Sequence, residues 1–146
     1  MFIKNMWAKY DYSNFPIVIV KFESDVDSEE DINQFLDEWL LLYDNKKNFT
    51  FVLDTTNMGL IKLKYCNKIR KFVKSIKELD SQYLEKSLVI VSNKAVKHLI
   101  NFIFKFQKPI SNLYIYNLKK KEELNINSLL DKIEKKDLEE FKIIKN

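Results

Sequence analysis

The chain has 146 residues, 46% of them hydrophobic and 14% aromatic, so we expect one folded domain with a sizeable core. This composition excludes a mainly disordered chain, and no apolar run reaches the roughly 20 residues that a membrane-spanning helix needs. Residues 1–60 carry five basic and eleven acidic side chains, residues 61–121 carry fifteen and three, and residues 122–146 carry five and seven, giving a net charge of +4.

Short β-rich runs alternate with helical periods along the chain. The first part predicts strands over 5–12 and 16–22, a helix that begins at Ser28, and a buried strand over 48–54. In the first helix, Ser28 and Asp31 have the spacing of a capping box, in a weaker form with aspartate as the acid.

The rest of the chain predicts a helix over 61–79, a strand over 87–92, a helix from Asn93 to Phe106, and a strand over 112–117. Residues 127–134 and 137–144 are predicted to be helical. We therefore expect an α/β domain over 1–125 in the order ββαβαβαβα, with a C-terminal helical extension over 126–146 packed on it. Strands joined by helices should be parallel, with right-handed crossovers.

Three short motifs carry a family resemblance. Residues 82–93 read QYLEKSLVIVSN, which is similar to the CRAL-TRIO segment where a Tyr-Pro-Glu run leads into a strand that ends in Asn. Val52-Leu53-Asp54 looks like the strand-terminal Leu-Asp of STAS and CRAL-TRIO domains, and Lys108-Pro109 stands where CRAL-TRIO chains often have a similar pair. Over residues 5–125 the chain thus resembles the SpoIIAA-like superfamily, and CRAL-TRIO domains most closely. The resemblance implies a mainly parallel sheet with helices stacked on one face.

The chain also departs from both families. Leu84 stands in place of the CRAL-TRIO proline, and no segment supplies the lid helix that closes a lipid cavity. Residues 60–64 read LIKLK and contain no hydroxyl where STAS domains carry their phosphorylated serine. Neither a full lipid carrier nor a phosphorylation switch is therefore carried over.

Polar side chains follow the carboxyl ends of the predicted parallel strands, where open α/β sheets bind ligands. They are Asp54, Thr55, Asn57, Ser92, Asn93 and Asn117. The same residue types cap helices and turns, and we favour that interpretation. No second carboxylate is predicted beside Asp54, so we expect no catalytic residue. With one cysteine, one histidine and one glycine, the chain offers no metal-ligand spacing and no phosphate loop, and we expect no metal and no cofactor.

Two helices present candidate binding surfaces. The third helix is apolar over more than half its circumference, and its candidate lipid or partner surface comprises Leu99, Phe102 and Phe106 with Lys94, Lys97 and Lys105. The second helix has a basic face formed by Lys64, Lys68, Lys71 and Lys74. The alternatives are that the protein's own C-terminal helices cover the third helix, and that the basic face is simply solvated.

The sheet face without helices also needs a cover. One alternate set of residues from each strand should line it, such as Val18 and Val20 or Tyr114 and Tyr116. The first strand with the C-terminal tail, a homodimer or an apolar ligand should close it.

These features predict a non-enzymatic cytoplasmic module, peripheral at a membrane, that resembles CRAL-TRIO domains and binds a lipid or an anionic membrane surface. The alternative is a STAS-like regulatory domain that binds a protein partner without lipid. Nucleic acid is not expected, because no known nucleic-acid module matches this element order.

Overall fold

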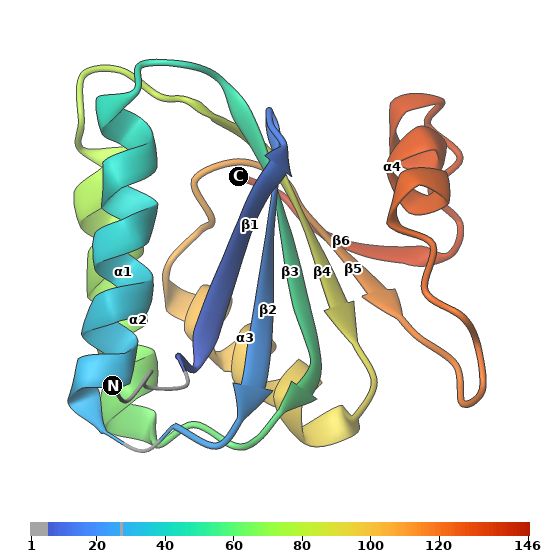
Figure 1. The fold of residues 1–146 in the computed structure, drawn as a ribbon, viewed down its shortest axis with the longest axis horizontal. Helices are drawn as coiled ribbons and strands as arrows, with labels where there is room; N and C mark the ends of the chain where they lie inside the picture. Colours follow the sequence, from blue (N-terminus) through green and yellow to red (C-terminus); the bar gives the residue numbers. More distant parts are fainter. Residues whose placement is uncertain (1–5, 27) are drawn as a thin grey trace.

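A six-stranded sheet runs through the centre of the protein (Figure 1). The structure is a computed structural model that describes residues 6–26 and 28–146. The strands are β1 (Ala8–Asn14), β2 (Ile17–Ser24), β3 (Phe49–Met58), β4 (Leu84–Val91), β5 (Leu113–Asn117) and β6 (Phe141–Ile144). They lie side by side in chain order. β2 to β5 are parallel, while β1 and β6 run antiparallel to their neighbours at the two edges.

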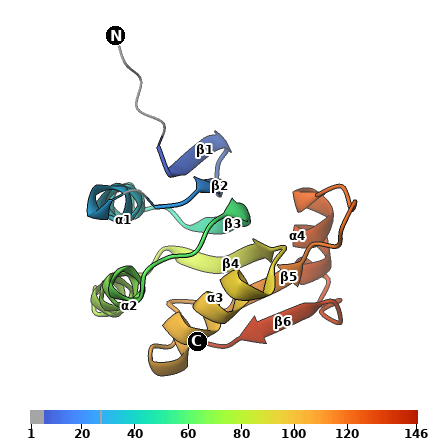
Figure 2. The ribbon, with the colours of Figure 1, turned by 90° about the horizontal axis from the view of Figure 1, so that it is seen from below.

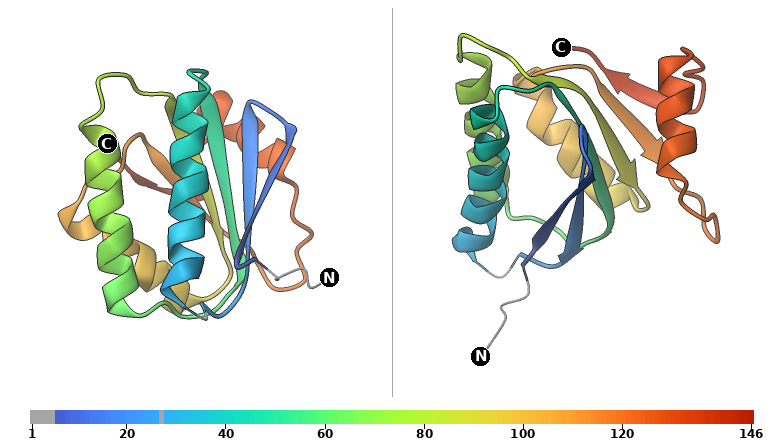
Figure 3. Two further views of the ribbon diagram at one scale, coloured as in Figure 1. Left: turned by 60° about the vertical axis from the view of Figure 1, so that its left-hand side comes forward. Right: turned by 45° about the horizontal axis from the view of Figure 1, so that its top comes forward.

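The four helices divide between the two faces of this sheet. They are α1 (Glu29–Asp44), α2 (Leu63–Lys77), α3 (Lys94–Phe106) and α4 (Ile126–Glu134). Each parallel strand lies beside the preceding one, so right-handed crossovers place α1, α2 and α3 on the same face (Figure 2). α4 joins two antiparallel strands, which that rule does not govern, and it lies on the opposite face (Figure 3). The predicted stacking of the helices on one face is therefore wrong for α4.

The predicted order of the first nine elements is confirmed, as are the α/β class and the parallel pairing. Of the first predicted strand, Asn5 lies outside the described residues. The N-terminal caps of α1 and α3 are also as predicted. The Ser28 backbone N–H donates to the Asp31 carboxylate at 3.3 Å, and Asn93 Oδ1 accepts from the Val96 backbone N–H at 2.8 Å. These contacts satisfy donors that the first turn of a helix leaves free.

The helix predicted over 137–144 is wrong. α4 ends at Glu134, Lys136 has a left-handed φ of 60°, and residues 141–144 then form β6 against β5. Phe141 pairs with Tyr116 and is buried, with 8% of its surface exposed. A short apolar run fits either a strand or a buried helix turn, and here the open edge of β5 determines the outcome.

The face under α1, α2 and α3 holds most of the core, including a chain of aromatic rings. The ring centroids of Trp7 and Phe22 are 4.8 Å apart, and those of Phe22 and Phe35 are 5.1 Å apart. Trp39 lies 5.8 Å from Phe35 and 5.1 Å from Phe51, so the rings connect α1 to β2 and β3. Rings at these distances contribute to stability beyond the apolar area that they bury.

The second face holds a smaller core under α4. Val52, Leu88 and Ile90 of the sheet pack there with Tyr116 and Phe141. α4 contributes the buried side chains Leu129 and Ile133. Of the residues predicted for this face, Tyr114 and Tyr116 are correct, whereas Val18 and Val20 are wrong. Val18 and Val20 instead point into the core under α1 to α3, where they are fully buried.

α4 leaves part of the second face uncovered. Beside it, Asn14, Ile17 and Ile19 line an open groove of about 500 Å³ together with residues 123–127. The C-terminal segment therefore provides part of the cover that this face requires.

Replacing Phe141 by alanine tests the position of β6. Phe141→Ala should lower the free energy of unfolding by about 3 kcal/mol or more, because it empties a buried aromatic site. Phe106→Ala, at a ring that is 70% exposed, should cost less than about 1 kcal/mol and serves as the control. Urea unfolding measures both, and a loss at Phe141 no larger than at Phe106 would contradict the buried strand.

Candidate functional site

The polar residues at the carboxyl ends of the strands make local contacts. The Asp54 carboxylate accepts hydrogen bonds from the backbone N–H of Thr56 at 3.0 Å and from the Thr56 hydroxyl at 2.7 Å. Thr55 Oγ1 donates to the Ile90 backbone carbonyl at 2.6 Å and so connects β3 to β4. Within the described part of the chain, no ionisable group hydrogen-bonds or ion-pairs with Asp54. These contacts stabilise the end of β3.

The other strand-end residues have structural roles or lie apart. Ser92 Oγ donates to the Thr56 backbone carbonyl at 3.2 Å, and Asn93 caps α3. Asn57 and Asn117 are exposed. A ligand crevice forms at this edge where the strand order reverses, and the order β1 to β6 contains no reversal. The strand-end crevice stays a prediction, while local hydrogen bonds already engage Asp54, Thr55, Ser92 and Asn93.

Cys66 and His98 occupy different environments. Cys66 lies on the buried side of α2, and burial raises the pKa of its thiol. His98 is exposed on α3. Across residues 6–26 and 28–146, no three His, Cys, Asp or Glu side chains are grouped as a metal site would require. This thiol is a core side chain.

The outer end of α3 is an exposed aromatic surface. Val96, Ile100 and Ile103 face the core, while Leu99 and Phe102 are half-buried. Phe106 is 70% exposed, the largest exposed fraction of any large hydrophobic side chain described. α4 does not cover this helix, because it lies on the other face of the sheet (Figure 3). From the C-terminal segment, β6 contacts α3 through Lys142 Nζ, which donates to Asn101 Oδ1 at 2.9 Å. The alternative that the protein's own C-terminal helices cover the extra apolar side chains of α3 is therefore wrong.

Cations surround the Phe106 ring. The guanidinium carbon of Arg70, on α2, lies 5.8 Å from the ring centroids of both Phe102 and Phe106. The ammonium of Lys105 lies 5.4 Å from the Phe106 centroid. Both distances suit cation–π attraction. Arg70 therefore joins the basic face of α2 to the aromatic end of α3.

The three helices on this face differ sharply in charge. α1 carries six acidic and no basic residues, α2 carries six basic and no acidic residues, and α3 carries three basic and no acidic residues. α2 packs between the other two (Figure 2). Charge thus changes from negative at α1 to positive at α2 and α3.

One ion pair marks the boundary between α1 and α2. Lys68 Nζ lies 2.9 Å from Glu29 Oε1, and this hydrogen bond and the lysine charge hold the pKa of Glu29 below its usual value. Of the other predicted basic-face residues, Lys64, Lys71 and Lys74 are exposed. On α3, Lys94 and Lys105 are exposed and Lys97 is half-buried. The acidic helix therefore neutralises one edge of the basic face and leaves the rest open.

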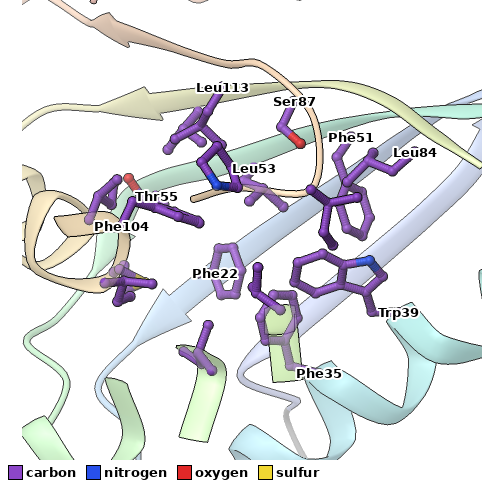
Figure 4. A pocket seen from close by; sticks show the side chains of 18 of the residues that line it. Phe22, Phe35, Trp39, Phe51, Leu53, Thr55, Leu84, Ser87, Phe104 and Leu113 are labelled. Atoms are coloured by element: carbon purple, nitrogen blue, oxygen red, sulfur yellow. The ribbon is translucent and has the colours of Figure 1, made fainter. Parts of the chain in front are cut away.

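An internal cavity of about 90 Å³ lies between the sheet and these helices. Figure 4 shows Trp39 and Phe35 from α1 at one end, Thr55 and Phe104 at the other, and Phe22 and Leu53 between them. The lining includes no charged side chain. Sequence gave no signal for this cavity, because its lining comes from residues of many separate elements rather than from a motif.

None of the helices described has both the length and the apolar composition needed to cross a bilayer.

Asparagine-to-alanine substitutions test whether Asn93 stabilises α3 as its cap, with the exposed strand-end residue Asn117 as the control. Asn93→Ala should lower the free energy of unfolding by about 1 kcal/mol, because it leaves a backbone donor of α3 without its acceptor. Asn117→Ala should change it by less than about 0.5 kcal/mol. Thermal and urea unfolding measure both values, and equal effects would argue against the capping role.

The buried thiol of Cys66 should be protected in the native state. We expect Ellman's reagent to react at least about a hundredfold more slowly than with a free cysteine, because access requires opening of the core. The rate should rise steeply across the urea transition. Fast reaction without urea would place the thiol at the surface.

No protein-family model matches the chain, and a search of curated proteins finds no similar sequence. The likeness to CRAL-TRIO and STAS domains therefore depends on the short motifs given above.

Proposed function

We propose that this protein is a non-enzymatic binding module, resembling CRAL-TRIO domains of the SpoIIAA-like superfamily, that docks on anionic membrane surfaces through α2 and α3. The observation that carries the proposal is the exposed Phe106 ring among cations. An aromatic ring that can enter the interfacial region, surrounded by lysine and arginine, is the arrangement by which amphipathic surfaces bind anionic lipid.

The charge distribution on α2 and α3 supports binding to a membrane of negative charge. Lys71, Lys74, Lys94 and Lys105 are exposed on two helices that carry no acidic residue. Each cation near an anionic surface contributes about 1 kcal/mol, so four contribute on the order of several kcal/mol. A solvated face without a ligand explains the lysines but not the exposed phenylalanine.

The size of the internal cavity favours surface docking over lipid transport. Ligand pockets commonly measure about 300–1,000 Å³. The cavity of about 90 Å³ is far smaller. The lipid-binding hypothesis is therefore proposed in its membrane-surface form. A STAS-like protein partner would use the same helix face and is the outcome to pursue if membranes do not bind.

Cosedimentation with vesicles tests the aromatic contact. The protein should bind phosphatidylcholine vesicles that contain phosphatidylserine, and Phe106→Ser should weaken binding about tenfold, because a ring of this size contributes roughly 1–2 kcal/mol when it enters the interface. The matched control is Leu41→Ser, since Leu41 is 59% exposed but lies on the acidic helix α1. Equal losses in the two variants would contradict docking through α3.

The same assay tests the basic face. The double variant Lys71→Glu, Lys74→Glu should lose more than about tenfold in binding, whereas Lys47→Glu, Lys120→Glu changes net charge equally outside α2 and α3 and should lose much less. Wild-type binding should fall between about 0.1 M and 1 M salt, as the Debye length shortens from about 10 Å to 3 Å. The proposal would be overturned if the wild-type protein did not bind anionic vesicles at low salt.

A further inference from the structure

Three buried polar atoms lack a hydrogen-bond partner among the residues that the structure describes. They are Nε1 of Trp7, Nε1 of Trp39 and Oγ of Ser111. The two tryptophans are only 4% and 6% exposed, so water at the surface does not reach their N–H groups. Buried tryptophan N–H groups normally find an acceptor, and an unpaired one costs free energy.

All three residues line the same internal cavity. Trp7 and Trp39 belong to its aromatic wall, and Ser111 belongs to the loop between α3 and β5. Unpaired polar groups scattered through a core would each need a separate explanation. Their concentration around one cavity points to a common cause, namely that something which accepts hydrogen bonds occupies the cavity.

We propose that this cavity binds a small uncharged molecule that has an apolar body and a hydrogen-bond acceptor, such as a carbonyl or ether oxygen. An indole N–H donates only, so the ligand must supply the acceptor. No charged side chain lines the cavity, so an ion would remain unpaired there and is excluded. This inference is independent of the membrane-facing surface.

The volume limits the size of the ligand. A water molecule takes about 30 Å³ of liquid, and an engineered cavity of about 150 Å³ takes up benzene. At about 90 Å³, this cavity accommodates a molecule smaller than benzene. Its apolar part would contact the rings of Phe22, Phe35 and Phe51, which all line the wall.

Water fits the lining less well than such a ligand. A buried water typically makes about three hydrogen bonds. The polar side-chain atoms of the lining belong to Trp7, Trp39, Thr55, Ser87 and Ser111, and the Thr55 hydroxyl already donates to Ile90. A cluster of waters would face mainly hydrocarbon, whereas a molecule with one acceptor would place only that atom against the donors.

Nuclear magnetic resonance of the ¹⁵N-labelled protein tests the site directly. Trp7 and Trp39 are the only tryptophans, so the spectrum contains two indole N–H signals and both report on the cavity. Acetone, which has a carbonyl acceptor, should move at least one signal downfield along a saturable curve. Xenon, a small apolar probe without an acceptor, should produce no such downfield shift. Trp7→Phe and Trp39→Phe assign the two signals.

A matched pair of serine variants tests whether the acetone-induced shift of the indole signals arises from binding in the cavity. Ser111→Val fills part of the cavity and should abolish the saturable shift, whereas Ser81→Val changes an exposed serine and should preserve it. A linear shift, or an equal response in both variants, would overturn the proposal. So would a long-lived water signal at the indole N–H groups that acetone does not displace. Should Ser111→Val not fold, the wild-type comparison of acetone with xenon decides alone.

Discussion

The right-handed crossover between neighbouring parallel strands determines most of this architecture. Each of β2 to β5 lies beside its predecessor, so each intervening helix must pass over the same face. Three helices of very different charge are thereby placed in one layer, in chain order. The basic surface of α2 and α3, the acidic surface of α1 and the cavity beneath them all follow from that placement.

The same constraint creates a second face without crossover helices, which the C-terminal segment partly closes. α4 contributes Leu129 and Ile133 above β4 and β5, and β6 extends the sheet with the buried ring of Phe141. The groove beside Ile17 and Ile19 is what this cover leaves open. The two faces thus differ in construction: one is closed by crossovers and the other by a single helix and an edge strand.

Much of the fold follows from local sequence patterns. Strand runs such as 87–92, the cap at Asn93 and the end of α3 at Phe106 were predictable, because each depends on residues adjacent in sequence. The strand at 141–144 was not, since its pairing depends on the free edge of β5. In α1, Leu40 is exposed whereas Leu42 is buried, because the exact position of the sheet decides which side of a helix is covered.

The candidate site was predictable only in part. Phe106, Lys94 and Lys105 were identified from the sequence of the helix and are exposed, whereas Lys97 is half-buried. The contact of Arg70 with Phe102 and Phe106 depends on how α2 packs against α3, which periodicity does not specify. Of the strand-end residues, Asn93 caps α3 and Asp54 bonds to Thr56, both local contacts, whereas the bonds of Thr55 and Ser92 to neighbouring strands depend on the sheet pairing.

The separation of charge across the helix layer makes the molecule an electric dipole. Six acidic residues on α1 and nine basic residues on α2 and α3 lie on helices of one face (Figure 2). In the field of a negatively charged surface such a dipole experiences a torque before any side chain makes contact. The molecule would turn α3 toward the surface and α1 away from it, so that β1, at the α1 side of the sheet, faces the solvent. The orientation of the molecule would thus be selected during its approach to the surface. A molecule that approached with α1 toward the surface would be repelled.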